Sequence, residues 1–516
     1  MSNQNRTIYG GKVNREKPIN FVFNGKSYIG YQGDTLASAL LANDVHLIGR
    51  SFKYHRARGI LTAGSEEPNA IVQLGLGART EPNIRATEVE LYEGLEASSQ
   101  NCWPSVNFDI GAMNNFLSRI FPAGFYYKTF KWPPSMWLFY EHFIRKAAGL
   151  GQSPTAKNPD RYEQKFYYTD ITIVGGGISG LLAALGAGRS GCKVLLIDEN
   201  PELGGYLLDY NFSINEKDGK KWLKKIIDEL NGLANVVILK RTTAMGYYDY
   251  NYLTALEKVT NHHVEFSSTL PRERYWRIRS KKVILAQGAF ERPLVFADND
   301  RPGIMMASAG QKYLSRYGVL PGKSVVLFTN NDHAYLTAFE FVEKGAKVTV
   351  VDTRDLLNAR ISEKCKSLNI TVFKSYSVIK TYGDKKVNRI EIQQVDKNQN
   401  QLTGEVENIH TDCVLMSGGW NPAVQLFSQS RGKLKYDLKI NTFVPDKIIE
   451  NQKIIGSNNG QFNLQENLNE SFEAGIAAAN ELNFNSVEKV NWTGKEEIEF
   501  TPVSYTHLRA HETSDY

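Results

Sequence analysis

Cysteine is scarce in this chain, and the few cysteines present follow no metal-binding pattern. The 516 residues contain four of them, Cys102, Cys192, Cys365 and Cys413. None belongs to a CxxC pair, and their wide spacing matches no set of metal ligands. Two of them lie at or beside apolar runs that read as buried strands. We therefore expect no metal site and assign these thiols to packing.

Long apolar runs and charge of one sign are also missing. No stretch of eighteen apolar residues occurs, and the first seventeen residues lack the apolar core of a signal peptide. A cytoplasmic protein with no membrane span is therefore expected. The 61 basic and 55 acidic residues give a net charge of +6 without any basic tract. This distribution favours an ordinary solvated surface over a nucleic-acid-binding face.

A complete dinucleotide-binding pattern is present at residues 170–205. It reads strand, glycine turn, helix, strand and acid, in an α/β unit of Rossmann type. Gly175 suits the tight turn, Gly177 lets the backbone approach a pyrophosphate, and Gly180 lets the helix pack closely on the strand. The helix N-terminus then offers free N–H groups to the phosphates. The whole unit is far more specific than an isolated GxGxxG.

The acid at the end of this pattern bears on the cofactor. Asp198 follows Gly175 at the spacing expected for the carboxylate that binds the adenosine ribose. A carboxylate there repels a 2′-phosphate, so NAD or FAD is favoured over NADP. A second glycine turn at Gly204 and Gly205 is typical of flavoproteins that bind two dinucleotides. The residues alone do not separate NAD from FAD.

The N-terminal segment predicts a β-grasp unit similar to a plant-type ferredoxin. Residues 18–30 read as a hairpin with Asn24-Gly25 at its turn, followed by a short helix capped by Asp34 or Thr35. No cysteine precedes Cys102, so an iron–sulfur cluster is excluded. The basic loop 51–59 is interpreted as solvated, or as a docking surface for a partner or an anion. The acidic turn at 66–69 is expected to pair with its bases.

An aromatic segment separates this unit from the glycine turn. Residues 115–150 are rich in aromatic side chains but interrupted by charges, and Pro133-Pro134 divides them into two helical pieces. We expect packing between domains or subunits here, with an interfacial membrane helix as the alternative. The polar stretch 153–164 is assigned as a linker.

A second strand–turn–helix–strand unit begins at residue 322. Its turn, Thr329 to Ala334, carries side chains where a pyrophosphate would lie, and Asp332 adds like charge. The backbone unit is therefore expected to survive without a dinucleotide. His333 in this turn is assigned a polar role, with proton transfer as the alternative.

The rest of the chain is expected to return to the first unit. A buried strand running into Gly288 is where flavoproteins of this type bring backbone close to the cofactor. The buried strand in residues 412–422 is interpreted as the point of return, and a loop followed by a long helix is expected to close over the cofactor. Candidate residues in that loop are Gly456, Asn458 and Gly460.

These observations give a predicted domain organisation. The fold class is α/β, with two Rossmann-like domains of the FAD/NAD(P)-binding flavoprotein superfamily after a cysteine-free ferredoxin-like domain. The predicted bounds are 1–105 for the β-grasp domain, 106–165 for the aromatic segment and linker, 166–296 with 412–490 for the nucleotide domain, and 297–411 for the second Rossmann-like domain. Residues 491–516 are interpreted as a truncated end whose last residues resemble a translated sequencing adapter.

With these motifs in hand, residues 15–495 resemble the α subunits of heterotetrameric sarcosine oxidases. The matching segments, in order along the chain, are GDTLASALLAN (33–43), GRSFKYHRARGI (49–60), AGSEEPNA (63–70), PAGFYYKTF (122–130), IDENPELGG (197–205), RTTAMGYYD (241–249), ERPLVFADNDRPGIM (291–305) and SGGWNP (417–422). Their order and spacing are together more specific than any one of them.

The resemblance implies a role within a complex. Such complexes oxidise sarcosine with O₂ to glycine, hydrogen peroxide and formaldehyde, or 5,10-methylenetetrahydrofolate when tetrahydrofolate is present. Amine oxidation takes place on FAD in the β subunit, electrons pass to FMN at the α–β interface, and γ and δ subunits complete the assembly. The α subunit carries NAD without redox turnover. The folate-binding half is absent here, so folate binding is not assigned.

The resemblance also implies roles for particular positions. Ser179 and the glycine turn would face the pyrophosphate, and Asp198, Glu199 and Asn200 would hold the adenosine ribose. Tyr206 would lie beside that ribose, and Ala244 would border the adenine. No catalytic residue is assigned.

Three alternatives are weighed against this interpretation. Large subunits of opine oxidases and hydrogen cyanide synthase share the layout, but many carry cluster cysteines that this chain lacks. A stand-alone NAD(P)H-flavin disulfide reductase requires a cysteine pair close in sequence and a working second nucleotide site. A scaffold that binds NAD only to stay folded is partly compatible with the leading interpretation.

Overall fold

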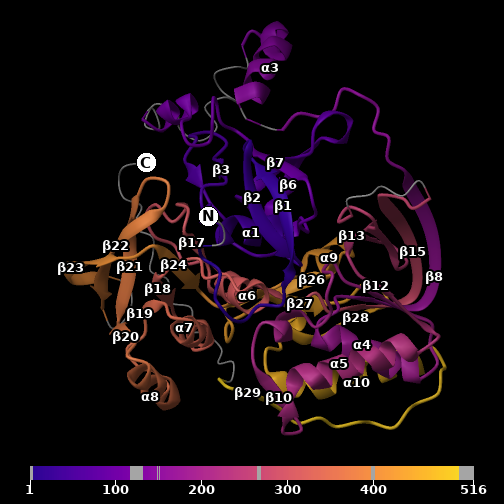
Figure 1. Ribbon diagram of the computed structural model, residues 1–516. Helices are drawn as coiled ribbons and strands as arrows, with labels where there is room; N and C mark the ends of the chain where they lie inside the picture. The colour runs from indigo at the N-terminus through magenta and orange to yellow at the C-terminus, as the bar shows by residue number, and fades with distance from the viewer. Residues whose placement is uncertain are drawn as a thin grey trace.

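Three units, each built on its own sheet, meet in the middle of the molecule (Figure 1). The computed structural model describes residues 4–116, 132–147, 149, 151–263, 269–396 and 401–498. The N-terminal unit lies above and between two α/β units, which are drawn at the lower right and at the left of Figure 1. The predicted fold class is confirmed: two Rossmann-like units follow a ferredoxin-like domain.

The N-terminal unit is a five-stranded sheet with one helix packed on it. Its order is β2 (Lys26–Gln32), β1 (Asn14–Phe23), β7 (Leu95–Ser99), β5 (Ile71–Leu74) and β6 (Glu81–Arg85). The β1–β2 turn has Asn24 at φ 53° and Gly25 at φ 74°, the positive angles that a two-residue hairpin requires. Helix α1 (Leu36–Ala42) is fully buried and begins at a reciprocal cap between Thr35 and Ser38. A short hairpin, β3 (Gly49–Arg50) with β4 (Ala57–Arg58), follows.

The first nucleotide unit has a seven-stranded sheet. The order is β12 (Val236–Leu239), β9 (Val194–Ile197), β8 (Tyr162–Val174), β15 (Glu273–Leu285), β14 (Tyr252–Lys258) and β13 (Thr242–Tyr248), with β28 (Gln452–Ile454) also pairing β15. The inner ends of β8 and β15 are continuous apolar runs because other elements cover both faces of the sheet there. Helices α4 (Ile178–Arg189), α5 (Gly219–Gly232) and α10 (Leu464–Asn480) lie below it in Figure 1.

The second α/β unit has a parallel sheet in the order β17 (Ile304–Met306), β24 (Cys413–Ser417), β18 (Ser324–Thr329), β19 (Lys347–Asp352) and β20 (Thr371–Lys374). Its helices are α6 (Ala307–Tyr317), α7 (Ala334–Glu343) and α8 (Ala359–Ser367). An antiparallel sheet of β21 (Tyr376–Gly383), β22 (Val387–Val395) and β23 (Leu402–His410) extends it.

The predicted return at residue 412 is wrong. β24 lies between β17 and β18 in the second sheet, so Cys413–Ser417 still belongs to the second unit. The return begins after it, where β25 (Trp420–Pro422) pairs antiparallel with β16 (Ala289–Glu291). Helix α9 (Gln425–Gln429) and the hairpin β26 (Lys433–Asp437) with β27 (Thr442–Lys447) then lead to β28.

The end of the described chain is part of a small sheet. β29 (Gly494–Glu496) pairs with β10 (Phe212–Ile214), which also pairs with β11 (Lys217–Asp218). Residues 494–496 are therefore integrated into the first nucleotide unit. The interpretation of the last residues as an adapter sequence concerns positions 501–516, which lie outside the described residues.

The basic loop 51–59 binds the second α/β unit instead of the acidic turn predicted for it. Arg56 contacts Asp298 at 2.6 Å and Asp300 at 2.7 Å, and Arg58 also pairs with Asp300. Glu67 of the acidic turn points inward and accepts hydrogen bonds from backbone amides. The positive charges of this loop therefore hold two units of the chain together.

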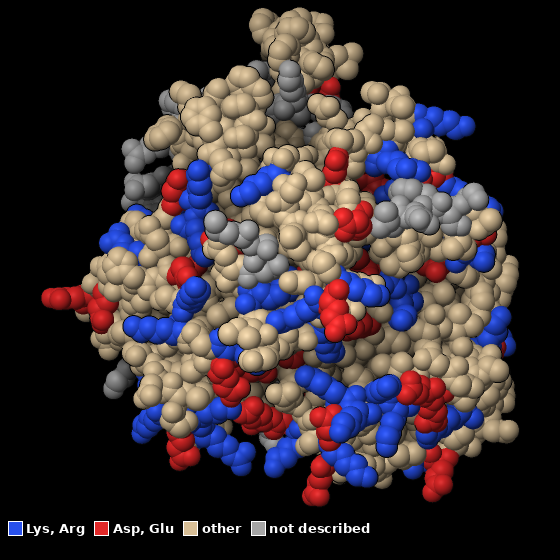
Figure 2. Space-filling model, viewed as in Figure 1, with Lys and Arg blue, Asp and Glu red and all other residues tan. Residues whose placement is uncertain are grey.

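The aromatic segment projects from the body of the molecule. Helix α3 (Trp137–Ala147) stands apart at the top of Figure 1, and this lobe shows few charged side chains in Figure 2. Trp137, Leu138, Phe139 and Phe143 are exposed. Residues 117–131 of the same segment lie outside the described residues. No helix of the described residues is long and apolar enough to span a membrane.

Candidate dinucleotide site

A cavity of about 470 Å³ opens at the carboxyl ends of β8, β9 and β15, the edge where nucleotides bind in sheets of this kind. Residues from all three units form its wall. Eleven of the fifteen predicted cofactor residues line it: Gly175, Gly177, Ser179, Asp198, Glu199, Asn200, Gly204, Gly205, Tyr206, Ala244 and Gly288. The N-terminal unit contributes Ser65, and the second α/β unit contributes His333.

The three glycines of the turn have different physical roles. A Cβ on Gly175, at φ +107°, would lie 2.2 Å from the carbonyl oxygen of Ala286. A Cβ on Gly180 would lie 1.7 Å from the carbonyl oxygen of Gly175, so this glycine packs the helix on the turn and does not line the cavity. A Cβ on Gly177 would meet no atom within 4 Å. Gly177 is therefore the glycine whose missing side chain leaves room in the cavity.

The second glycine turn packs directly on the first. The amide of Gly204 donates to the carbonyl oxygen of Gly176 at 2.8 Å. A Cβ on Gly205, at φ +55°, would lie 3.1 Å from the Cα of Gly177. The two turns thus form one glycine-walled surface beside the N-terminus of α4.

Asp198 is hydrogen-bonded to the glycine turn and also lines the cavity. Its Oδ2 accepts from the amide of Gly176 at 2.6 Å, and its Oδ1 accepts from the amide and side chain of Asn200 at 2.7 and 3.1 Å. Burial raises the pKa of its carboxyl. The neighbouring Glu199 accepts a hydrogen bond from the hydroxyl of Ser65 at 2.9 Å. The two acids therefore bring carboxyl groups to the end of β9, where the ribose is predicted to bind.

The loop after β28 does not bring its predicted residues to the cavity wall. Gly456, at φ +67°, packs on Ser179, Asn458 donates to the carbonyl oxygen of Ala423 at 2.7 Å, and Gly460 makes a left-handed turn. Ser457 and Asn467 line the cavity instead. The loop is where it was expected, but the side chains facing the cavity are different ones.

The far end of the cavity is an aromatic cluster. Tyr206 stacks on Tyr210 with ring centres 4.4 Å apart, and Trp420 lies edge-on to Tyr206 at 6.2 Å. His333, at the start of α7, hydrogen-bonds the Tyr206 hydroxyl through Nε2. The Tyr206 ring thus contacts Tyr210, His333 and Trp420. Its place beside the adenosine ribose stays a prediction.

The cluster is uncharged at neutral pH. Burial lowers the pKa of His333 to about 4 and raises the pKa of Tyr206 and Tyr210 well above its usual range. The imidazole therefore stays neutral, and both phenols keep their protons. The Tyr206 hydroxyl can then donate to an unprotonated Nε2 of His333.

Several cavity residues carried no signal in the sequence. Ser65, Gln287, Trp420 and Asn467 lie in four distant segments and match no general binding pattern. Ser65 and Trp420 fall within the segments AGSEEPNA and SGGWNP that carry the family resemblance. Such segments could have directed attention to them, although without saying what they contact.

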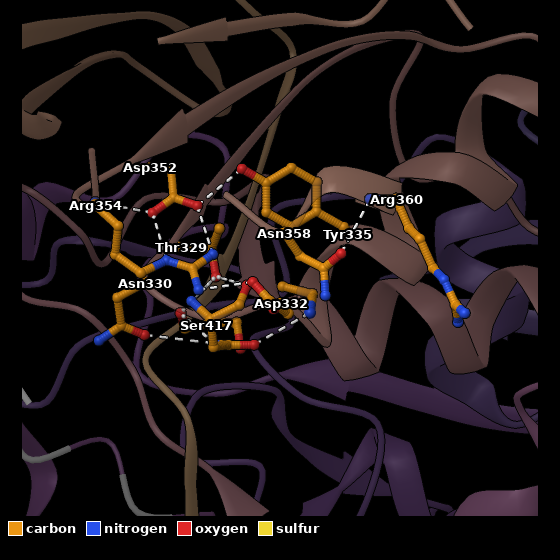
Figure 3. Close-up of polar contacts among 11 residues, drawn as sticks. Thr329, Asn330, Asp332, Tyr335, Asp352, Arg354, Asn358, Arg360 and Ser417 are labelled. Carbon is orange, nitrogen blue, oxygen red and sulfur yellow. Dashed lines mark hydrogen bonds and ion pairs between the residues drawn. The ribbon is translucent and has the colours of Figure 1, made fainter. Parts of the chain in front are cut away.

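The corresponding turn of the second α/β unit is filled by its own side chains (Figure 3). Arg354 pairs with Asp332 at 2.7 Å and with Asp352 at 2.8 Å, and Tyr335 donates to Asp352 at 2.8 Å. Asn331 donates to the hydroxyl of Ser417 at 3.0 Å. Polar side chains thus satisfy one another at the position where a glycine turn would face a pyrophosphate.

Glu291, close to the aromatic cluster, gives a testable pH dependence. Its carboxylate accepts from the amide of Ser308 at 2.8 Å, and burial raises its pKa from 4.5 to about 7. The folded protein therefore holds this proton to higher pH than the unfolded chain, and stability falls as pH rises from about 4.5 to 7. Glu291→Gln should stabilise the protein at pH 8 by no more than about 3 kcal/mol.

Thermal unfolding at two pH values measures this effect. The melting temperature of Glu291→Gln should exceed that of the wild type at pH 8, and the two should converge at pH 4.5. Gln can still accept from the Ser308 amide, so the comparison isolates the charge. A lower melting temperature at pH 8 would show that the charged carboxylate stabilises the fold.

The thiols show no features of a redox pair. All four cysteines are free, and Cys192, Cys365 and Cys413 are buried. Burial raises the pKa of the Cys192 and Cys365 thiols to about 11 and that of Cys413 to about 12. The described residues contain no group of three or more His, Cys, Asp or Glu side chains placed to hold a metal ion.

Two family models match the chain. Residues 169–447 match a pyridine nucleotide-disulphide oxidoreductase, and residues 16–102 match a 2Fe-2S iron-sulfur cluster binding domain. Within that second range Cys102 is the single cysteine, so the residues do not fit a cluster. The match concerns the fold of the domain, whereas the cluster ligands are missing.

Curated proteins and solved structures extend the comparison. Sarcosine oxidase subunit alpha of Rhizobium meliloti (strain 1021) is 46% identical over 448 residues, covering 86% of this chain and 44% of that protein. Its counterpart in Corynebacterium sp. (strain U-96) is 33% identical over 458 residues, covering 87% of this chain and 42% of that protein. The chain thus spans less than half the length of these relatives.

A solved structure with a similar fold is L-proline dehydrogenase from P. horikoshii. It has a TM-score of 0.59 at 19% identity, and the match covers 92% of this chain and 75% of that one. At this identity the likeness concerns the fold alone. The family model and the relatives show that the chain belongs to the pyridine nucleotide-disulphide oxidoreductase family and is homologous to sarcosine oxidase α subunits over most of its length.

Proposed function

We propose that this chain is the NAD-binding part of the α subunit of a sarcosine oxidase complex. The observation that carries the proposal is the cavity wall, where the open Gly177 turn lies beside Asp198 and Glu199. A cleft with free backbone at a helix N-terminus suits a pyrophosphate. Two carboxylates beside it suit ribose hydroxyls and oppose a 2′-phosphate. This combination favours NAD or FAD over NADP, and the resemblance to sarcosine oxidase α subunits favours NAD, with FAD as the alternative.

The cavity residues divide along the length of such a ligand. Gly177 and Gly205 would face the pyrophosphate, and Asp198 with Glu199 would hold the adenosine ribose. Residues 242–245, which include Ala244, would border the adenine. Ser65 would add a hydroxyl from the N-terminal unit. NAD bound in this way would tie the three units together, since each contributes to the wall.

The proposed reaction belongs to the complete complex. It would oxidise sarcosine with O₂ to glycine, hydrogen peroxide and formaldehyde, or to 5,10-methylenetetrahydrofolate when tetrahydrofolate is supplied. Flavin chemistry would take place on a β subunit and on FMN at the interface with it, with γ and δ subunits completing the assembly. This chain would supply the folded nucleotide unit and no catalytic residue.

The projecting helix α3 is the surface that we propose for contact with another subunit. Trp137, Phe139 and Phe143 are exposed there, and aromatic side chains of this kind concentrate in protein interfaces. We propose also that the second α/β unit binds no dinucleotide, since Arg354 and Asp332 occupy its turn with their own ion pair.

Among the alternatives, a stand-alone disulfide reductase is the least compatible with the structure. Its chemistry requires a low-pKa thiol that can attack a disulfide. Burial raises the pKa of three of the four thiols here, and that of the fourth, Cys102, is raised as well.

The nucleotide released on denaturation tests the proposal. We expect the purified chain to be colourless and to release NAD, identified by mass spectrometry and absorbance. Addition of sarcosine should leave that NAD oxidised, because this chain carries no amine-oxidising site. A yellow protein that releases FAD would contradict the NAD assignment and would favour a flavin-dependent oxidoreductase instead.

A further inference from the structure

Two buried polar atoms at the far end of the cavity have no hydrogen-bond partner among the described residues. They are the indole Nε1 of Trp420, a donor, and the amide Oε1 of Gln287, an acceptor. Both side chains line the cavity. Leaving such groups unpaired when buried costs about 1–3 kcal/mol each, so native structures rarely tolerate two in one place. A ligand that pairs both would recover this free energy.

Two paired segments of the chain carry these side chains. Gln287 follows the end of β15, and Trp420 begins β25, whose partner strand β16 starts two residues after Gln287. Between them, the amide of Ala423 donates to the carbonyl oxygen of Gly288 at 3.0 Å. The donor and the acceptor are therefore held by one paired segment.

Aromatic rings form much of the surrounding wall, and the charged groups that act on Tyr206, such as Glu496 of the cavity lining, are acids. The rings of Tyr206 and His333 lie 5.3 Å apart, and those of His333 and Trp420 lie 6.0 Å apart. His333 is neutral and Tyr206 keeps its proton, as described above. A flat ring fits against such faces, whereas a carboxylate or phosphate would find no cation in this cluster to balance it.

We propose that Trp420 and Gln287 recognise the carboxamide of a nicotinamide ring. The indole N–H would donate to the carboxamide oxygen, and the Gln287 amide would accept from the carboxamide nitrogen, while the ring packs on the aromatic cluster. This inference rests on the proposed function, because Asp198 and Glu199 fix the opposite, adenosine end. It adds that the cavity selects the nicotinamide portion of the cofactor.

ADP-ribose separates this inference from the nucleotide site as a whole, because it keeps the adenosine and pyrophosphate and lacks nicotinamide. We expect the wild-type chain to bind NAD more than about tenfold more tightly than ADP-ribose, because one well-made buried hydrogen bond gives a factor of about ten and ADP-ribose lacks both bonds. Trp420→Phe keeps an aromatic ring and removes the donor. It should reduce NAD affinity about tenfold and leave ADP-ribose affinity unchanged.

Titration calorimetry on the nucleotide-free full chain measures both affinities. Trp222→Phe is the matched control, since Trp222 packs on Trp492 outside the cavity, and it should change neither. Equal losses of NAD and ADP-ribose affinity in Trp420→Phe, or no loss of either, would overturn the carboxamide site while leaving the nucleotide site standing. A wild-type chain that binds neither ligand would overturn the proposed function as well.

Discussion

Gly177→Val should abolish nucleotide binding and leave the fold intact. The backbone at Gly177 has φ −70° and ψ −175°, an extended conformation that valine adopts readily. Its Cβ would meet no protein atom within 4 Å, so the new side chain would extend into the cavity against the pyrophosphate position. We expect NAD affinity to fall at least about 100-fold, equivalent to about 2.7 kcal/mol.

Thermal unfolding with and without NAD provides the measurement. At a hundredfold excess over its dissociation constant, NAD should stabilise the wild type by about 2.7 kcal/mol, because it binds only the folded state. Gly177→Val should unfold like the nucleotide-free wild type and gain nothing from NAD. A variant that NAD still stabilises fully would refute the assignment of the pyrophosphate to this turn.

Gly180→Ala is the contrasting control. Its Cβ would lie 1.7 Å from the carbonyl oxygen of Gly175, a backbone atom that cannot move without opening the turn. This variant should therefore lose stability whether or not nucleotide is present. The two substitutions distinguish a glycine required by the ligand from a glycine required by the fold, although both belong to one sequence pattern.

Local patterns predicted the parts of the fold that local physics determines. Gly175 and the Asn24-Gly25 turn have positive φ angles, which few residues other than glycine and asparagine adopt. They can therefore be read without knowing what surrounds them. Asp198 at the end of the next strand follows from the same unit, because parallel strands bring their carboxyl ends to one edge.

The position of a buried strand among several sheets could not be predicted in the same way. Cys413–Ser417 is an apolar run that would fit the middle of either parallel sheet. Its pairing with β17 and β18 is decided by which neighbours it meets in three dimensions. The sequence therefore predicts that this strand is buried, but it does not predict which strands pair with it. The predicted boundary at 412 was wrong for that reason.

Cavity residues supplied by other units were missed for a related reason. Ser65 and Trp420 come from segments far from the glycine turn, and each reaches the cavity through packing between units. His333 was noticed in the degenerate turn, but nothing local shows that it would face the first unit's cavity. Contacts between units depend on long-range geometry, which neither periodicity nor spacing encodes.

Glu67→Ala should strongly destabilise the protein although Glu67 lies away from the cavity. The side chain is 1% exposed, and its carboxylate accepts four backbone amides, those of Leu61 at 2.9 Å, Thr62 at 2.6 Å, Asn69 at 2.7 Å and Ala70 at 2.9 Å. Truncation would leave these donors unpaired at about 1–3 kcal/mol for each that stays buried. We expect a loss of at least about 4 kcal/mol, measured by urea unfolding.

The same substitution should weaken nucleotide binding, because the loop that Glu67 holds in place also positions Ser65, whose hydroxyl donates to Glu199. The loop is anchored on α6, where Tyr313 donates to the carbonyl oxygen of Thr62 at 2.9 Å and Lys312 to that of Ala63 at 2.8 Å. Glu66→Ala, at the exposed neighbouring acid, should leave unfolding within about 0.5 kcal/mol of the wild type. Equal stability of the two variants would mean that water replaces the carboxylate. If Glu67→Ala is destabilised but binds NAD as tightly as the wild type, the loop does not contribute to nucleotide binding.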